Sequence, residues 1–233
     1  TADRLSPVAY GLVGLLLAGA VAYQRDGLTP DSCWYLDVAE QLANGRGLVT
    51  DIVFYDSQYA ARTVPVPYTI QSPLYSLLVA CLIRVGVPSI TSAATVNVLC
   101  FGLSAVSVFE LGMVVHGRLV GHLATCGFLL TTCILSAVTM VWTETLFILF
   151  SSRAVLAACR AVEAECPSVR TWFECGTLAG MSFLARTTAL FLIAGLCVVA
   201  VTSWVIRSRT RAARLCLLCW LLPAVAVPLL MIG

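Results

Sequence analysis

Residues 28–48 read LTPDSCWYLDVAEQLANGRGL and form the first polar stretch after an opening apolar run. Pro30 and Asp31 together are typical of a helix start, because residues of these types cap and begin a first turn. The apolar side chains that follow are spaced four apart, at Trp34, Val38 and Leu42. This spacing predicts a short amphipathic helix over residues 31–44, and Gly45 is suited to end it.

The composition of the whole chain indicates a membrane protein. Of the 233 residues, 60% are hydrophobic and only 11% are charged, whereas an ordinary soluble domain is about 25% charged. Several apolar runs reach the roughly 20 residues with which a helix crosses a bilayer. We therefore expect an all-α polytopic membrane protein whose main partner is the lipid bilayer, with the helix over 31–44 lying on the membrane surface. The formal net charge of +2 gives no indication of a nucleic-acid partner.

The predicted spans make the chain, residues 1–233, a single transmembrane domain with one long polar loop. The spans are residues 5–23, 91–115, 119–141, 144–161, 172–187, 188–206 and 213–232. The loop between the first two, residues 24–90, holds the helix over 31–44 and a second apolar segment, residues 73–88. This segment is too short to cross, so we expect an interfacial or re-entrant helix whose Arg84 reaches headgroup phosphates.

The distribution of arginine indicates which loops face the cytosol. The densest basic loop contains Arg207, Arg209, Arg211 and Arg214, and loops rich in basic residues favour the cytosolic side. Counting back from it, span by span, places Arg186 and Glu144 on the opposite, extracytoplasmic side. The same count puts the loop 24–90, and with it Asp31, on that side. The topology thus predicts that three ionisable side chains, far apart in the sequence, meet at one membrane face.

Glu144 and Arg186 each interrupt an apolar run, and a charge at such a place is costly unless it has a partner or a function. Each on its own is equally well explained as a helix end whose side chain reaches water. Their predicted location on the same face as Asp31 favours a functional site. Of the other charges inside apolar runs, we expect Glu110 to reach water and Arg153 to pair within the bundle.

Five short motifs give the chain a resemblance to a known superfamily. Residues 31–48, DSCWYLDVAEQLANGRGL, resemble the D-(E/S)-x-x-Y-x-x-x-A-x-x-L-x-x-G signature of GT-C glycosyltransferases. In the same order follow QSPLY at 71–75, GRLVG at 117–121, TETLF at 143–147 and LARTTAL at 184–190. These motifs are most similar to those of the dolichyl-phosphate-mannose protein mannosyltransferase and aminoarabinose transferase superfamily.

The resemblance implies a GT-C-like helical bundle whose first extracytoplasmic loop carries short juxtamembrane helices. It also implies an enzyme that moves a hexosyl or pentosyl unit from a polyprenyl-phosphate donor to a hydroxyl of a protein, lipid or glycan, with inversion at the sugar carbon. By position in the motifs, Asp31 acts as general base on the acceptor hydroxyl or positions it. Arg186 binds the lipid phosphate, and Glu144 orients the sugar or a basic side chain. We expect further donor contacts from Tyr35 and Gln71. Gln71 stands where some relatives have a lysine, and we expect Arg62, with Arg84 as the alternative, to supply the phosphate contact of that lysine.

Departures from the family pattern bear on cofactors and on length. Ser32 stands where a second acidic residue is common, which does not support a two-carboxylate metal site at 31–32. His116 and His122 have no metal-ligating partners near in sequence, so we expect no metal site and no required cofactor, with a divalent cation as the alternative. The chain stops at Gly233, before the many spans of typical relatives, and we interpret it as a short member or a fragment.

Two alternative functions are also compatible with the sequence, and its composition indicates a cellular location. A transporter or flippase of a lipid-linked substrate is one alternative, although the inverted repeats expected of it are not visible in the sequence. A non-catalytic membrane scaffold is the other. Arginine supplies all 14 basic residues and no Asn-x-Ser/Thr sequence occurs, which favours a prokaryotic plasma membrane with the site on its extracytoplasmic face.

Overall fold

The computed structural model describes residues 2–22, 28–53, 63–68, 71–164 and 168–206, together with Trp220 and Ala224. The helices are α1 (Ala2–Ala22), α2 (Pro30–Ala43), α4 (Leu74–Arg84), α5 (Ser89–His116), α6 (Arg118–Leu130), α7 (Thr132–Thr139), α8 (Glu144–Glu163), α9 (Val169–Ala185) and α10 (Ala189–Ile206). The strands β1 (Val49–Thr50) and β2 (Val66–Pro67) pair antiparallel, with Val49 opposite Pro67.

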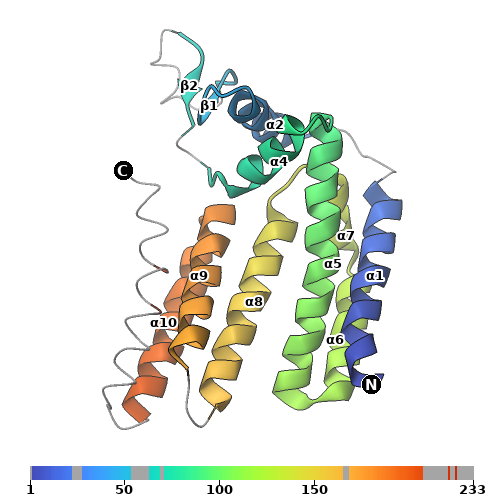
Figure 1. Ribbon diagram of the computed structural model, residues 1–233, viewed down its shortest axis with the longest axis vertical. Coiled ribbons are helices and arrows are strands. Elements are labelled where there is room, and N and C mark those ends of the chain that lie inside the picture. The colour runs from blue at the N-terminus through green and yellow to red at the C-terminus, as the bar shows by residue number, and fades with distance from the viewer. Residues whose placement is uncertain are drawn as a thin grey trace.

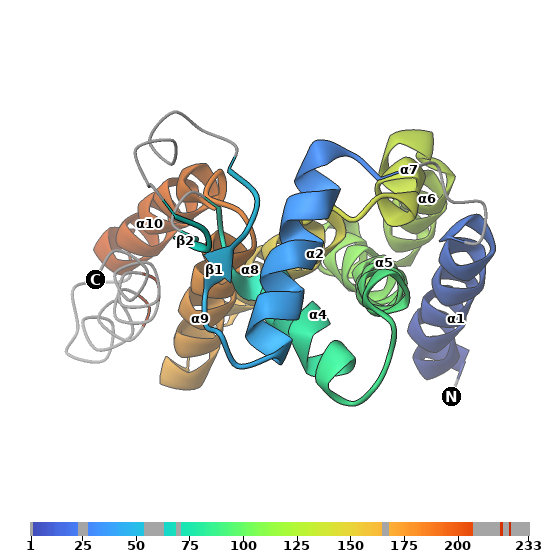
Figure 2. The same ribbon diagram turned by 90° about the horizontal axis from the view of Figure 1, so that it is seen from above.

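The elements form an upright bundle with a cap across one end (Figure 1). The bundle consists of α1 and α5 to α10, and the cap consists of α2, α4, β1 and β2. Seen from above, α2 and α4 cross over the ends of the bundle helices (Figure 2). If the bent pair of α6 and α7 is counted as one segment, successive segments of the bundle run in opposite directions, so α5 and α8 begin at the capped end and α1 and α9 finish there. The sequence positions just before α8 and just after α9 therefore lie beneath the cap.

The helices agree with an all-α membrane protein. By length and composition, α5 and α8 are able to cross a bilayer, and α6 with α7 makes a third span if the bent pair is taken together. The helices α1, α9 and α10 occupy the predicted spans 5–23, 172–187 and 188–206 at similar bounds, and their crossing stays a prediction. The predicted span 213–232 lies outside the described residues, except for Trp220 and Ala224.

The predicted span 119–141 is divided into two helices. The chain bends by 52° between α6 and α7, around Thr131. The Thr131 hydroxyl donates a hydrogen bond to the carbonyl of Gly127 at 2.8 Å, and its N–H bonds to Phe128, one residue closer than in a regular α-helix. Threonine that bonds back to its own helix in this way bends it. Neither proline nor glycine marks the break, which is why the pattern of apolar residues did not predict it.

The first cap helix begins and ends much as its sequence indicates. Thr29 is the N-cap of α2 and its side chain accepts a hydrogen bond from the N–H of Ser32, while Pro30 takes the first helical position. Beyond the last turn, Gly45 has a φ of 76°, a left-handed conformation that favours glycine. The apolar face of α2 is buried within the cap instead of facing lipid, since Trp34 and Val38 pack against Tyr68. The location of α2 at the membrane surface stays a prediction.

The second cap helix, α4, packs beneath α2 and over the end of α5. Tyr75 and Val79 of α4 are fully buried and share a cluster with Tyr35 and Ala39 of α2. The hydroxyl of Ser76 donates to the carbonyl of Tyr35 at 3.1 Å. With 11 residues, α4 is about 16 Å long at 1.5 Å per residue. This length and its course across the bundle agree with the short segment predicted over residues 73–88 (Figure 2).

The other end of the bundle is closed by backbone contact and by ion pairs. A Cβ added to Gly112 of α5 would lie 2.7 Å from the Cα of Gly121 in α6, so the two backbones touch. Nearby, a carboxylate oxygen of Glu110 accepts from Arg153 at 2.9 Å and from Arg160 at 3.1 Å. The expected pairing of Arg153 is confirmed. The expectation that Glu110 only reaches water is wrong, because two arginines of α8 lie opposite it.

Candidate active site

A pocket of about 480 Å³ opens where the cap meets the bundle. Its walls come from α2, from the segment before α4, from the turn before α8 and from the turn after α9. The lining residues are Asp31, Tyr35, Gln71, Ser72, Trp142, Thr143, Glu144, Ala185, Arg186, Thr187 and Thr188. Segments more than 100 positions apart in the sequence therefore contribute to one cavity. Counting the spans predicted that three of these residues, Asp31, Glu144 and Arg186, lie on the same side.

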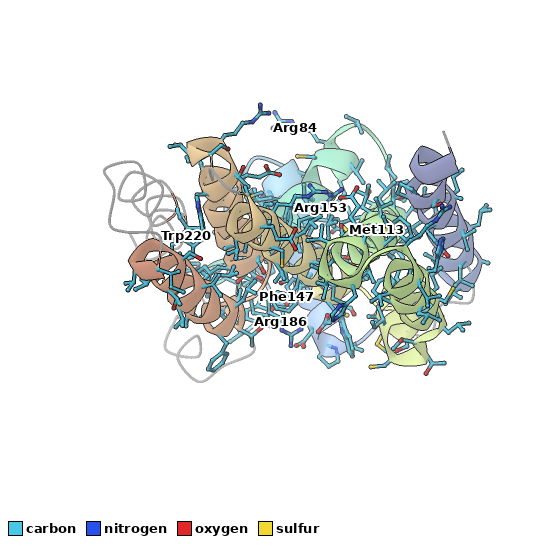
Figure 3. The ribbon with its side chains drawn as sticks, turned by 90° about the horizontal axis from the view of Figure 1, so that it is seen from below. Arg84, Met113, Phe147, Arg153, Arg186 and Trp220 are labelled. Atoms are coloured by element: carbon cyan, nitrogen blue, oxygen red, sulfur yellow. The ribbon has the colours of Figure 1, made fainter. Side chains whose placement is uncertain are left out.

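Arg186 occupies the sharp connection between two bundle helices. The helix α9 ends at Ala185, Arg186 is extended, and α10 begins at Ala189. The end of α9 is also fastened to the cap, since the buried hydroxyl of Ser72 donates to the carbonyl of Phe183 at 2.9 Å. Viewed from the end opposite the cap, Arg186 and Arg153 lie at well-separated positions, so the two arginines belong to different clusters (Figure 3).

Glu144 is the first residue of α8 and forms an ion pair with Arg186. A carboxylate in the first turn of a helix is favoured by the partial positive charge of the free N–H groups there. The two side chains are 31% and 41% exposed, so the pair is accessible from the pocket. Asn97 of α5 holds this end of α8, because its side-chain oxygen accepts from the hydroxyl of Thr145 at 3.0 Å.

Asp31 lies in the first turn of α2 and is exposed to the pocket. The N-cap before it is well connected: the indole N–H of Trp142 donates to the Thr29 hydroxyl at 3.1 Å, and Ser32 is fully buried beside the same hydroxyl. Asp31 therefore presents a solvent-accessible carboxylate from a firmly anchored helix end. The Arg186–Glu144 ion pair lines the same cavity.

Tyr35 and Gln71 add polar groups to the wall. Burial raises the pKa of Tyr35 to about 12, a rise that hydrogen bonding with the Thr143 side chain opposes and that the nearby Asp31 and Glu144 increase. Tyr35 is thus a neutral phenol at physiological pH. The side-chain oxygen of Gln71 is buried and has no hydrogen-bond partner among the described residues. A buried amide oxygen without a partner is a site at which a ligand hydroxyl can donate.

Five of the six predicted site residues line this pocket, and their roles stay predictions. They are Asp31, Tyr35, Gln71, Glu144 and Arg186, while Arg62 lies outside the described residues. The pocket is also lined by residues that the sequence pattern did not single out, namely Ser72, Trp142 and the threonines at 143, 187 and 188. A partial signal existed, since four of them lie inside the motifs quoted above and Trp142 directly precedes one, but a motif alone does not show which of its residues face the cavity. In the part of the chain that the structure describes, no three His, Cys, Asp or Glu side chains form a metal-binding group.

The fold and the pocket define a helical membrane protein with a carboxylate and a carboxylate–guanidinium pair at one end of its bundle. Residues 70–232 match the model of the dolichyl-phosphate-mannose-protein mannosyltransferase family, and the chain belongs to that family. It is therefore a membrane glycosyltransferase of GT-C type. The matched segment contains Gln71, Glu144 and Arg186, whereas Asp31 and Tyr35 precede it. No curated protein and no solved structure matches the chain.

Proposed function

We propose that the protein transfers a sugar from a polyprenyl-phosphate donor to an acceptor hydroxyl at the extracytoplasmic face of the membrane, with inversion at the sugar carbon. The observation that supports this function best is the pocket itself. It places an exposed carboxylate, Asp31, and a cation, Arg186, on the walls of one cavity between cap and bundle. A transfer of this kind needs a base for the incoming hydroxyl and a positive charge for the departing phosphate.

Asp31 is the general base in this proposal. Its carboxylate takes the proton of the acceptor hydroxyl while the acceptor oxygen forms a bond to the anomeric carbon. The bond between that carbon and the phosphate oxygen breaks, and the electron pair stays on the polyprenyl phosphate. The exposure of Asp31 suits this role, because an acceptor can reach its carboxylate from the pocket.

Arg186 stabilises the charge that develops on the phosphate. A guanidinium has five N–H donors, and the ion pair with Glu144 engages one of its terminal nitrogens. The remaining donors are suited to a charge-assisted contact with phosphate oxygens. Glu144 fixes the orientation of the guanidinium and accepts hydrogen bonds from sugar hydroxyls.

Tyr35 and Gln71 complete the donor site. Tyr35 stays protonated and donates to an oxygen of the donor, while the unpartnered oxygen of Gln71 accepts from a sugar hydroxyl. Arg62 is the further phosphate contact expected from the sequence. The acceptor is a protein, lipid or glycan, and the transferred unit is a hexose or a pentose. No step requires a metal, and a divalent cation at the phosphate is the alternative.

The distribution of charges supports the proposed location. The four arginines between 207 and 214 support a cytosolic position for that loop and hence an extracytoplasmic pocket. The exclusive use of arginine supports a prokaryotic plasma membrane. Labelling of single cysteines with a membrane-impermeant reagent checks this: a cysteine placed at Glu40 should react from outside and one placed at Arg209 only from inside.

The decisive experiment is a transfer assay with the purified chain in liposomes, using a panel of polyprenyl-phosphate sugars and acceptors. We expect Asp31→Asn to lower the rate by about 10²–10⁴-fold, the usual contribution of a general base. Glu40→Gln, an exposed carboxylate on the same helix, is the matched control and should leave the rate unchanged. Undiminished transfer by Asp31→Asn refutes the base assignment. Movement of the donor across the bilayer without transfer would support the transporter hypothesis instead.

A further inference from the structure

The turn between α7 and α8, residues 140–143, connects the two sides of the pocket. Trp142 lies two positions before Glu144, and Thr29 lies two positions before Asp31. The indole N–H of Trp142 donates to the Thr29 hydroxyl at 3.1 Å. This hydrogen bond thus joins the segment just before Glu144 to the segment just before Asp31.

The Thr29 hydroxyl is well placed to transmit this contact to α2. The same oxygen accepts from the backbone N–H of Ser32 at 3.2 Å and shares a hydrogen bond of 2.8 Å with the Ser32 hydroxyl. It is therefore the N-cap of the helix, and Asp31 stands in the turn that this cap begins. A displacement of Thr29 displaces the first turn and the Asp31 carboxylate with it.

The turn on the other side is itself rigidly held. Asn97 of α5 is fully buried, and its amide donates to the carbonyl of Met140 at 2.7 Å. Its oxygen accepts from the hydroxyl of Thr145 at 3.0 Å. Asn97 thus forms hydrogen bonds with the chain on both sides of Trp142. The turn is mounted on α5, the central helix of the bundle, and does not depend on the cap for its position.

The packing of α2 gives the hydrogen bond between Trp142 and Thr29 a specific role. Along most of its length α2 packs on α4, and the described residues show no extensive packing of α2 on α8. The pocket therefore lies between cap and bundle, which are also joined by the packing of α4 on α5 and α9 and by the hydrogen bond of Ser72 with Phe183. At the end of α2 that carries Asp31, Trp142 donates a hydrogen bond to Thr29, and Tyr35 lies close to the Thr143 side chain.

We propose that Trp142 is a positioning residue that sets the distance between Asp31 and the Glu144–Arg186 pair through its hydrogen bond to Thr29. The inference rests on the proposed function and deepens it. Trp142 acts through α2, so its effect falls on the alignment of base, acceptor and donor. Because a shift of about 1 Å in such an alignment can cost about 10²-fold in rate, the contact governs kcat and leaves the donor KM unchanged.

The test is a double-mutant cycle in the liposome assay. Trp142→Phe removes the N–H and keeps an aromatic ring, and Thr29→Val removes the acceptor and keeps the shape. We expect each variant to lower kcat by about 10–100-fold at an unchanged donor KM. The double variant should be no slower than Thr29→Val alone, because both changes break the same bond. Thr29→Ser, which keeps the hydroxyl, should retain the rate within about 2-fold of the unchanged chain.

Controls separate positioning from stability and from substrate contact. All rates are taken at a temperature at which thermal unfolding shows every variant folded, since Thr29→Val also loses the cap. Additive losses of kcat in the cycle, or a Thr29→Ser variant as slow as Thr29→Val, would overturn the inference. A raised donor KM at constant kcat for Trp142→Phe would overturn it as well, because Trp142 would then be a substrate contact.

The failure of this inference is distinguishable from the failure of the proposed function. If the unchanged chain transfers sugar and Asp31→Asn does not, additive losses refute only the positioning by Trp142. If the unchanged chain transfers no sugar with any donor of the panel, both proposals are refuted together.

Discussion

The two ends of the bundle each hold a glutamate paired with arginine, and the surroundings of the pairs differ. At the capped end, Glu144 and Arg186 line a pocket of about 480 Å³ together with the exposed Asp31. At the other end, Glu110 receives hydrogen bonds from Arg153 and Arg160 of the neighbouring helix, beside the contact of α5 with α6. The first pair lines a pocket that can hold a ligand, whereas the two ion pairs of Glu110 join α5 to α8.

The comparison shows that an ion pair in a membrane protein is not by itself evidence of a site. Both clusters interrupt apolar runs, and both join groups distant in sequence. They differ in their surroundings, because the Glu144–Arg186 pair lines one pocket together with a second carboxylate, Asp31, and with Gln71. We therefore expect changes at the capped end to affect transfer, and changes at the opposite end to affect stability.

The largest expected effect is that of Arg186→Gln, which removes the cation and keeps much of the side-chain volume. We expect kcat/KM for transfer to fall by about 10²–10³-fold, the loss typical of removing one group that stabilises transition-state charge. The control is Arg170→Gln, an exposed arginine at the far end of the same helix, which should transfer normally. Equal rates for both variants would remove Arg186 from the site.

A second prediction concerns the closed end of the bundle. Gly112→Ala places a Cβ 2.7 Å from the Cα of Gly121, which is a backbone atom and cannot rotate away as a side chain can. Overpacking of this kind costs about 1–3 kcal/mol of unfolding free energy. Gly127→Ala is the matched control in α6, because a Cβ there meets nothing within 4 Å. Thermal unfolding in detergent should show a lowered Tm for the first variant alone, and equal Tm values would contradict the close contact.

A third prediction contrasts the two glutamates directly. Glu110→Gln leaves two guanidinium groups without their carboxylate, and we expect a loss of about 1–2 kcal/mol in unfolding free energy, discounted for partial exposure. Its kcat should match that of the unchanged chain. Glu144→Gln should show the reverse, a lowered kcat with little change in Tm. A variant of Glu110 that folds normally but fails to transfer would show that the closed end takes part in the reaction.

The smallest effect is expected within the closed end itself. The Arg160 side chain is 50% exposed, compared with 33% for Arg153, and both bond to the same oxygen of Glu110. Exposed ion pairs contribute about 0–1 kcal/mol, so Arg160→Gln should lower the Tm less than Arg153→Gln does. The two variants measured side by side in one unfolding series test this order, and the reverse order would assign the main contact to Arg160.

Much of the fold was predictable because a bilayer imposes strong rules on sequence. The apolar runs mark the bundle helices α1, α5, α8 and α10 within a few residues, since a helix in lipid needs a continuous apolar stretch. The break at Thr131 was not predictable in this way. It arises from a hydroxyl that bonds back to its own helix, and the composition around it is as apolar as in an unbroken span.

The site was predictable only in part, and the reason is again physical. Counting spans predicted that Asp31, Glu144 and Arg186 lie at one end of the bundle, because each crossing reverses direction, and the three residues line one pocket. It did not show that Glu144 pairs with Arg186, since pairing depends on side-chain distances. Trp142 stands next to a motif, yet nothing in its neighbours indicates a hydrogen bond to a threonine more than 100 positions earlier.

The sequence by itself determined the membrane class, the family motifs and the meeting of three ionisable groups at one end of the bundle. These follow from hydrophobicity and from the parity of crossings, which are properties of the chain read in order. Only the tertiary structure decided which charges pair, that α2 buries its apolar face in the cap, and that Asn97 and Trp142 connect the bundle to the helix of Asp31. Hydrogen bonds and close packing act over a few ångströms, and folding alone brings distant residues within that range.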